Sequence, residues 1–250
     1  MRALLMIYSI CCYLAGVAAL VFLILFMADW WVPVTVNSGS AYAPQLSPLL
    51  AMGWNTLLVL LWGLQHSVMA DPAFKKFWVR IVPPAVERST YVLTVAIVTF
   101  AIILLWCPIP HMLWQTSGSV LGYTLSGVYV FGWVVVLVST FLINHWHLFG
   151  LQQAYQQVRN LPSKESSFVT PLLYKLVRHP MMTGVLISLW AVADMSWGRL
   201  LFAVLMTVYV YLGTRHEEKT LTAELGEKYQ EYCKTTPMLV PGVPKIRRVN

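Results

Sequence analysis

The chain has 250 residues, of which 58% are hydrophobic and only 11% are charged. Soluble domains carry about 25% charged residues, so this composition excludes an ordinary soluble domain and predicts an integral membrane protein. The formal net charge of +7 does not indicate nucleic-acid binding, because the basic residues are scattered around the ends of apolar segments and build no nucleic-acid-binding motif.

Six apolar segments predict an all-α, polytopic membrane protein with about six transmembrane helices. Four segments are near the ~20 residues that a helix needs to cross a bilayer, and the last two are shorter. The six lie at about residues 3–27, 49–69, 91–107, 121–143, 181–195 and 200–214. No repeat of fixed period divides the chain, so we expect a single membrane domain over residues 1–250.

Two polar segments predict further helices outside the apolar core. Residues 151–176 begin with a Gln-rich stretch that favours a short interfacial helix and a linker. Residues 217–233 mix carboxylates, Lys and apolar side chains at helical spacing. We expect this second segment to continue the last span out of the membrane.

The distribution of Lys and Arg predicts the orientation. With six crossings, Arg199 lies on one side and all other Lys and Arg residues lie on the side of the two termini. Cytoplasmic loops hold an excess of Lys and Arg, so we expect both termini in the cytoplasm and the basic loops facing an anionic leaflet of the lipid bilayer.

Polar clusters occupy the ends of the apolar segments on the predicted cytoplasmic side. They lie at residues 65–67, 87–91, 144–147, 178–180 and 215–218. Helix ends often hold polar residues that only cap or snorkel, but the opposite ends hold isolated polar residues without a pattern. This asymmetry favours chemistry that faces the cytosol. The four cysteines have no metal-type spacing, and no metal ion is expected.

Pro180 predicts the local backbone at the start of the fifth apolar segment. A proline in the first turn of a helix forfeits no needed N–H group and keeps Val177 and Arg178 extended. Their backbone groups would then be available to a ligand. Gly184, one turn later, would allow a cofactor or another helix to come close.

Residues 170–241 resemble the carboxy-terminal half of the isoprenylcysteine carboxyl methyltransferase superfamily, which consists of integral-membrane enzymes that use S-adenosylmethionine. The residues that carry the resemblance are Tyr174, Arg178, His179, Pro180, Gly184, Glu217, Glu218, Gly226, Tyr229, Tyr232 and Pro237. It implies a cofactor-binding helical hairpin with contacts from His179, Pro180, Glu217 and Tyr229. Met182 stands where many members have tyrosine, so either another ring covers the cofactor or that ring is dispensable.

The same residues provide a partner for each part of S-adenosylmethionine. Glu217 or Glu218 would pair with its amino group, and Arg178 or Arg215 would bind its carboxylate through a guanidinium fork. Aromatic rings would face the adenine or the sulfonium, and the candidates are Tyr174, Tyr229 and Tyr232. The product of the cofactor would be S-adenosylhomocysteine.

Three segments of the amino-terminal half, residues 63–70, 87–91 and 144–151, are similar to bacterial methanethiol S-methyltransferases. This resemblance implies methyl transfer to a small apolar thiol, which yields dimethyl sulfide when the thiol is methanethiol. It also implies a bacterial inner membrane with the active site facing the cytosol. Residues 1–150 would then be a four-helix part that shapes the acceptor site.

A small alkyl thiol is largely protonated at neutral pH, so a base or a cationic pocket would assist its reaction. His145 is the preferred candidate for the base. The other candidates for catalysis are His66 and the Glu87–Arg88 pair, with Asn144 and Gln65 as orienting groups.

Two alternatives remain open from the sequence. The first keeps methyl transfer but changes the acceptor to a lipid amine or an isoprenylcysteine carboxylate. The second is a membrane protein that binds haem or a metal through histidines at one depth, namely His66, His145, His147 and His179. No two of these histidines share a helix face at the i, i+4 spacing.

Overall fold

The computed structural model describes residues 2–162 and 170–242. Four of the basic residues that predict the orientation, Lys164, Lys245, Arg247 and Arg248, lie outside the described residues. The predicted orientation of the termini stays a prediction.

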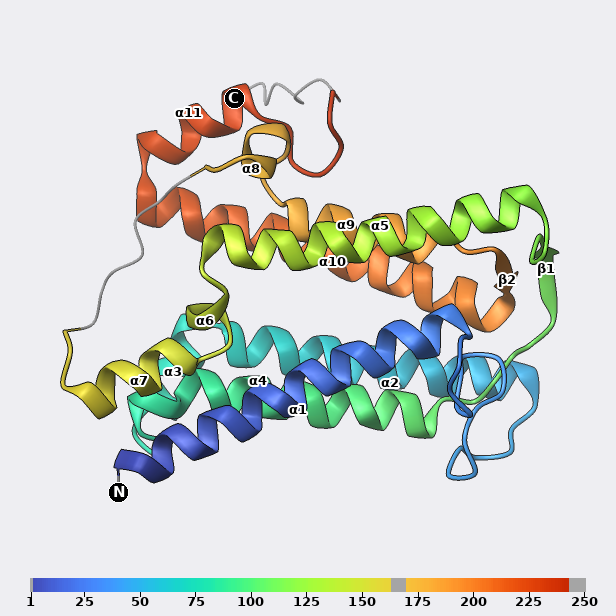
Figure 1. Ribbon diagram of the computed structural model, residues 1–250, viewed down its shortest axis with the longest axis horizontal. Helices are drawn as coiled ribbons and strands as arrows, with labels where there is room; N and C mark the ends of the chain where they lie inside the picture. Colours follow the sequence, from blue (N-terminus) through green and yellow to red (C-terminus); the bar gives the residue numbers. More distant parts are fainter. Residues whose placement is uncertain (1, 163–169, 243–250) are drawn as a thin grey trace. The chain divides into compact units, whose positions relative to one another are not determined.

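Long helices dominate the described residues (Figure 1). The five longest are α1 (Arg2–Ala28), α2 (Pro48–Ala70), α4 (Pro84–Leu105), α5 (Val120–Ile143) and α10 (Trp197–Leu225). The shorter helices are α3 (Pro72–Trp78), α6 (His145–Leu148), α7 (Leu151–Arg159), α8 (Leu173–Leu176), α9 (Pro180–Trp190) and α11 (Glu227–Thr235). The two strands are β1 (Met112–Gln115) and β2 (Asp194–Ser196), which pair with each other.

By length and composition, five helices in the described part of the chain can cross a membrane. The predicted all-α, polytopic membrane fold is therefore confirmed. The predicted short interfacial helix corresponds to α7, and α10 continues to Leu225, as the pattern of residues 217–233 indicates.

The fifth predicted span is shorter than expected. It corresponds to α9, which has 11 residues and is about 16 Å long at 1.5 Å per residue. This is about half of the ~30 Å hydrocarbon core of a bilayer. The helix stops at Trp190: Ala191 leaves the helical conformation with φ −87° and ψ 64°, and the Ala193 carbonyl accepts hydrogen bonds from the backbone N–H and the hydroxyl of Thr116.

The chain divides into two compact units, and each is described by itself. Unit 1 comprises Met1–Trp114, Asn144–Ser166 and Asp194–Leu205. Unit 2 comprises Gln115–Ile143, Ser167–Ala193 and Met206–Asn250. The helix α10 begins in unit 1 and ends in unit 2.

In unit 1, α4 packs against both α1 and α2, and α7 packs against α1 and α4. The hydroxyl of Ser89 donates to the hydroxyl of Ser9, 2.9 Å away, so a buried polar contact fixes α4 on α1. Gly150 precedes α7 with a φ of +88°, and a Cβ there would lie 2.6 Å from the backbone nitrogen of Ser89. Glycine therefore allows the start of α7 to sit directly on α4.

At the other end of unit 1, a buried asparagine ties α2 to the chain after α4. The Asn55 side chain donates to the Cys107 carbonyl at 2.7 Å and accepts from the Cys107 backbone N–H at 2.9 Å. The indole of Trp54 donates to the Leu105 carbonyl at 2.8 Å. These bonds satisfy backbone groups at the end of α4 that the helix itself leaves without partners.

In unit 2, α5 and α9 lie side by side at very short distance (Figure 1). A Cβ on Gly184 would lie 2.5 Å from the carbonyl oxygen of Gly132, and a Cβ on Gly132 would lie 2.7 Å from that of Gly184. Small residues at such a contact allow two membrane helices to pack backbone against backbone. The hydroxyl of Ser188 on α9 donates to the Tyr129 carbonyl on α5 at 2.9 Å.

Candidate active site

Val177, three residues before Pro180, has the predicted extended backbone. Val177 has φ −143° and ψ 152°, and α9 begins at Pro180. The backbone N–H groups of Arg178 and His179 donate to the carbonyls of Pro237 and Met238, at 2.9 and 3.1 Å. Because the chain itself accepts from these two amides, the ligand contact predicted for this segment would have to use other backbone groups.

Arg178 connects the start of α9 to α10 and to the end of α11. Its Nε donates to Oε1 of Glu218 at 2.6 Å, and its Nη2 contacts the same carboxylate oxygen. Its Nη1 donates to the carbonyl oxygens of Thr236 and Cys233. With its donors directed to these groups, Arg178 holds the local structure together.

Arg215 is the alternative cation for a ligand carboxylate. It lies on α10, where its Nη1 atom is 3.4 Å from the hydroxyl of Tyr211 and its guanidinium carbon is 5.9 Å from the centre of that ring. These contacts are within one turn of the same helix. Of the two predicted carboxylate-binding arginines, Arg215 therefore has the weaker attachment to the protein.

His179 lies between the two consecutive carboxylates of α10. Its Nδ1 is 3.5 Å from Oε2 of Glu217, and its Nε2 is 3.4 Å from Oε1 of Glu218. The His179 side chain is buried, whereas the Glu217 side chain is 52% exposed. Glu218 has the largely buried Arg178 as its counter-charge, so Glu217 is the carboxylate of this cluster that a cationic ligand can reach.

Three tyrosines gather beside these carboxylates. The Tyr232 hydroxyl donates to the Tyr174 carbonyl, and the rings of Tyr232 and Tyr229 meet edge to face at 6.0 Å. Burial raises the pKa of Tyr174 to about 12, with a further contribution from the charge of Glu217. Burial also raises the pKa of Tyr232 to about 12 and raises the pKa of Tyr229.

All three phenols are therefore neutral at physiological pH, and their rings are compatible with a cationic ligand. Tyr229 is only 1% exposed, so it packs inside the cluster and supports its neighbours. The structure brings Tyr174, Tyr229 and Tyr232 together with the two carboxylates, as the sequence predicts.

Gly184 meets another helix. The space a Cβ would fill is occupied by the backbone of α5 at Gly132 and Val136. The sequence predicted that Gly184 allows either a cofactor or another helix to come close. The structure shows the close approach of a helix.

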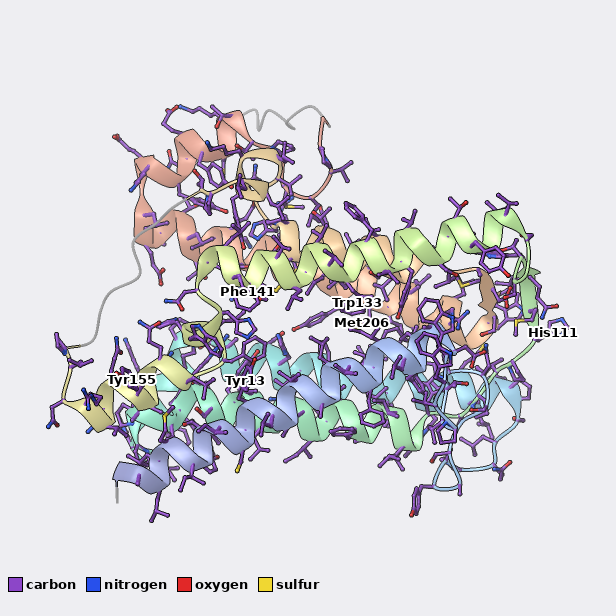
Figure 2. The ribbon with its side chains drawn as sticks, in the orientation of Figure 1. Tyr13, His111, Trp133, Phe141, Tyr155 and Met206 are labelled. Atoms are coloured by element: carbon purple, nitrogen blue, oxygen red, sulfur yellow. The ribbon has the colours of Figure 1, made fainter. Side chains whose placement is uncertain are left out.

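The second candidate cluster belongs to unit 1 and is centred on His145 in α6. The His145 ring is 5% exposed, and its Nε2 atom is 3.1 Å from the Tyr13 hydroxyl. The rings of Trp146 and Phe149 lie 5.2 and 4.7 Å from it. Tyr13 extends from α1 toward α6 (Figure 2). Burial in this aromatic surrounding lowers the pKa of His145, so its imidazole is neutral near pH 7.

Asn144 orients the turn that carries His145. Its side-chain oxygen accepts from the His147 backbone N–H at 3.1 Å, which caps α6, and its amide donates to Gln152 at 2.6 Å. Asn144 has a φ of 144°, an unusual value for a residue other than glycine. Its two side-chain bonds hold this conformation, so Asn144 supports His145 through the backbone.

The other predicted catalytic residues surround Tyr91. The Tyr91 hydroxyl is 3.0 Å from Nε2 of His66, whose ring is stacked on Trp62 at 4.9 Å. The Arg88 guanidinium lies 4.6 Å from the centre of the Tyr91 ring, and its Nε donates to the Leu148 carbonyl at 2.7 Å. Glu87 lies in the first turn of α4, and Gln65 donates to the sulfur of Met69. Catalytic roles for these residues stay predictions.

The histidines of the haem or metal alternative have other surroundings. His66 and His145 each contact a tyrosine, and His179 contacts two carboxylates. Residues 2–162 and 170–242 contain no group of three or more His, Cys, Asp or Glu side chains that could hold a metal ion.

Comparison with known proteins gives relatives along nearly the whole chain. Methanethiol S-methyltransferase 2 of Bradyrhizobium diazoefficiens is 40% identical over 249 residues, which cover 100% of this chain and 94% of the relative. The methanethiol S-methyltransferases of Pseudomonas deceptionensis and Mycobacterium tuberculosis are 43% and 38% identical, and the matches cover 85% and 96% of this chain and 79% and 97% of those proteins. The chain belongs to the methanethiol S-methyltransferase family. No family model and no solved structure matches it.

Membership of the methanethiol S-methyltransferase family makes the protein a methyltransferase, as predicted, and a methyltransferase needs a methyl donor. The matches extend over both candidate clusters, so the family assignment includes the amino-terminal half as well as the residues around Glu217. It favours methyl transfer over the haem or metal alternative.

Sequence reasoning missed Tyr13 in this methanethiol S-methyltransferase. The residue lies within the apolar run of α1, where nothing in the pattern distinguishes it from its neighbours. Its partner His145 is 132 positions away. Only the packing of α6 and α7 against α1 and α4 reveals this contact.

Proposed function

We propose that this protein transfers the methyl group of S-adenosylmethionine to methanethiol and releases dimethyl sulfide and S-adenosylhomocysteine. The observation that carries the proposal is the similarity of the whole chain, at 40% identity, to a protein named methanethiol S-methyltransferase. The bacterial relatives support a bacterial inner membrane, and the distribution of Lys and Arg supports an active site on its cytosolic side.

The residues of unit 2 fit the chemistry of this donor. S-adenosylmethionine supplies a methyl group that its sulfonium already activates, and it carries one amino group and one carboxylate. Glu217 would pair with the amino group because it is the half-exposed carboxylate of its cluster. Arg215 would bind the carboxylate, while His179 would hold Glu217 in place.

The neutral rings of Tyr174 and Tyr232 would lie against the cationic or aromatic part of the donor. Arg178 and Glu218 would maintain the cluster without contacting the donor, since they are bound to each other. The contribution of these residues is to bind and orient; a thiolate in line with an activated methyl group needs little further assistance.

Binding of S-adenosylhomocysteine to the purified protein tests the donor, and calorimetry would measure it. Glu217→Gln preserves shape and removes the charge. A hydrogen bond to a charged group contributes about 1.5–3 kcal/mol when it is shielded from water. Because Glu217 is half-exposed, we expect a contribution at the lower end of this range. We therefore expect affinity to fall about tenfold.

Glu224→Gln is the matched control. Glu224 lies on the same helix and is exposed, and its replacement by glutamine changes the charge by the same amount. Its affinity for S-adenosylhomocysteine should equal that of the wild type. Equal losses in both variants would mean that Glu217 acts only through long-range charge, and no binding to the wild type would refute the donor assignment.

The acceptor is tested by direct competition. Membranes and purified protein are supplied with S-adenosylmethionine and with methanethiol, a prenylated cysteine or an aminophospholipid. Gas chromatography measures dimethyl sulfide, and transfer of labelled methyl groups measures the other products. We expect turnover with methanethiol only. Transfer to the lipid or prenyl acceptor in preference to methanethiol would overturn the proposed acceptor while retaining the donor.

A further inference from the structure

The segment that follows α11 is bound along its length to the start of α9, and both lie in unit 2. We call residues 236–239 the C-terminal strap. Each carbonyl group of the strap accepts a hydrogen bond from a donor on residues 178–183. In order from residue 236 to residue 239, the donors are Nη1 of Arg178, the backbone N–H of Arg178, the backbone N–H of His179 and the hydroxyl of Thr183.

Both ends of the C-terminal strap are buried. Thr236 is 5% exposed and Leu239 is 8% exposed. Backbone carbonyl groups in a buried segment need hydrogen-bond donors, and the donors for this segment lie on the turn that carries His179. The position of the strap and the position of the His179 backbone are therefore fixed together.

His179 connects the C-terminal strap to the carboxylates of α10. Its backbone N–H donates to the Met238 carbonyl at 3.1 Å. Its ring lies 3.5 Å from Oε2 of Glu217 and 3.4 Å from Oε1 of Glu218. The His179 side chain is buried, so its ring moves with its backbone. A displaced strap would therefore change the contact between His179 and Glu217, which is the half-exposed carboxylate of the cluster.

Thr183 holds the C-terminal strap through an uncharged group. Its hydroxyl donates to the Leu239 carbonyl at 2.6 Å, and the His179 carbonyl is 3.2 Å from the same hydroxyl oxygen. The shorter contact is the stronger hydrogen bond, so the main partner of this hydroxyl is the strap. Valine is similar in shape to threonine but has no donor. Thr183→Val therefore removes one attachment of the strap and leaves the charges of the cluster in place.

We infer that Thr183 is a positioning residue for the methyl donor, because it holds the strap that keeps His179 and Glu217 arranged for the donor's amino group. This inference rests on the proposed function. In this role Thr183 acts through His179 and does not contact the donor. Its loss should weaken binding of ligands that carry the amino-acid group and leave the methyl-transfer step unchanged once the donor is bound.

The experiment compares Thr183→Val with Thr183→Ser and Thr214→Val in the full-length purified protein. Serine retains the hydroxyl that donates to the strap. Thr214 is the matched control, because it lies in the part of α10 that belongs to unit 2 and its hydroxyl donates to the Val210 carbonyl of its own helix at 2.7 Å.

Calorimetry measures the binding of two ligands to each variant. The first is S-adenosylhomocysteine. The second is 5′-methylthioadenosine, which retains the adenosine and the sulfur but lacks the amino and carboxylate groups. A general loosening of the fold would weaken both ligands to the same extent, whereas a displaced Glu217 would weaken the first ligand only.

For Thr183→Val we expect the affinity for S-adenosylhomocysteine to fall about fivefold, the loss that one hydrogen bond of ordinary strength produces. The affinity for 5′-methylthioadenosine should stay nearly unchanged. In turnover assays, KM for S-adenosylmethionine should rise by a similar factor at nearly unchanged kcat. Thr183→Ser should restore the wild-type values, and Thr214→Val should bind both ligands as the wild type does.

Equal losses for the two ligands in Thr183→Val, or wild-type affinity for S-adenosylhomocysteine, would overturn the inference. So would a loss in Thr183→Ser as large as that in Thr183→Val. Leu239→Ala perturbs the same attachment from the strap and does not depend on how well Thr183→Val folds. It should weaken S-adenosylhomocysteine more than 5′-methylthioadenosine, and equal weakening would contradict the role of the strap.

The wild type separates the two levels of the argument. Absence of S-adenosylhomocysteine binding to the wild-type protein would refute the proposed function and the inference with it. Binding by the wild type that Thr183→Val leaves unchanged would refute the role of Thr183 alone.

Discussion

Replacing Gly132 by alanine tests the backbone-to-backbone contact between α5 and α9. The added Cβ would lie 2.3 Å from Ser188 Oγ, 2.7 Å from the Gly184 carbonyl oxygen and 2.9 Å from the Ser188 backbone nitrogen. The Ser188 hydroxyl can rotate away, but only by giving up its bond to the Tyr129 carbonyl. The two backbone atoms can move only if the helices separate.

These contacts determine the expected magnitude. Overpacking of this kind costs about 1–3 kcal/mol, and the lost hydrogen bond costs about 1 kcal/mol more. Alanine offsets about 1 kcal/mol of this through its higher helix propensity. The net expectation is a loss of about 1–3 kcal/mol in the free energy of unfolding.

Gly127→Ala on the same helix is the control. A Cβ on Gly127 would meet no atom within 4 Å, so only the gain in helix propensity remains, up to about 1 kcal/mol. Reversible denaturation in mixed micelles, followed by circular dichroism, measures both variants. The two substitutions should change stability in opposite directions. If Gly132→Ala were as stable as Gly127→Ala, the close packing of α5 and α9 would be refuted.

Three further substitutions have defined outcomes. Asn55→Ala leaves both backbone groups of Cys107 without their partner. It should lower the free energy of unfolding by about 2–4 kcal/mol, measured by the same denaturation. A variant as stable as the wild type would contradict the role of Asn55 in holding α2 to the end of α4. Arg178→Lys retains the charge, but a lysine cannot reach Glu218, Cys233 and Thr236 together. The free energy of unfolding should therefore fall by about 2 kcal/mol. An unchanged denaturation midpoint would show that one positive charge is enough to hold these groups. The pKa of His145 is lower in the folded protein than the ~6.5 of an unfolded chain. The unfolded state therefore binds more protons below that pH, and the free energy of unfolding should decrease as pH falls through about 6.5. His145→Gln should remove that part of the decrease, and an identical pH dependence in this variant would exclude His145 as its source.

The membrane helices were predictable because each apolar run ends abruptly. The limits of α1, α2 and α5 agree with the apolar runs to within one residue. Pro180 likewise predicted the first residue of α9. In contrast, α4 starts at Pro84, before its apolar run, because the polar residues 87–90 lie in its first turns.

The strands and the exact partners at the site were not predictable from the sequence. The strands β1 and β2 have four and three residues, too few to show an alternating pattern, and they pair across a long stretch of sequence. The clustering of Arg178 and Glu218 followed from the hairpin, but the bonds of Arg178 to the Cys233 and Thr236 carbonyls depend on how the chain turns after α11.

The hydrogen bonds from Arg178 and His179 to Pro237 and Met238 have a consequence for biogenesis. The carbonyls of residues 237 and 238 supply the acceptors, so the entry to α9 is complete only when these residues have been synthesised. These acceptors leave the ribosome long after α9 has been made. The final seating of this short helix therefore depends on a segment that is made after it.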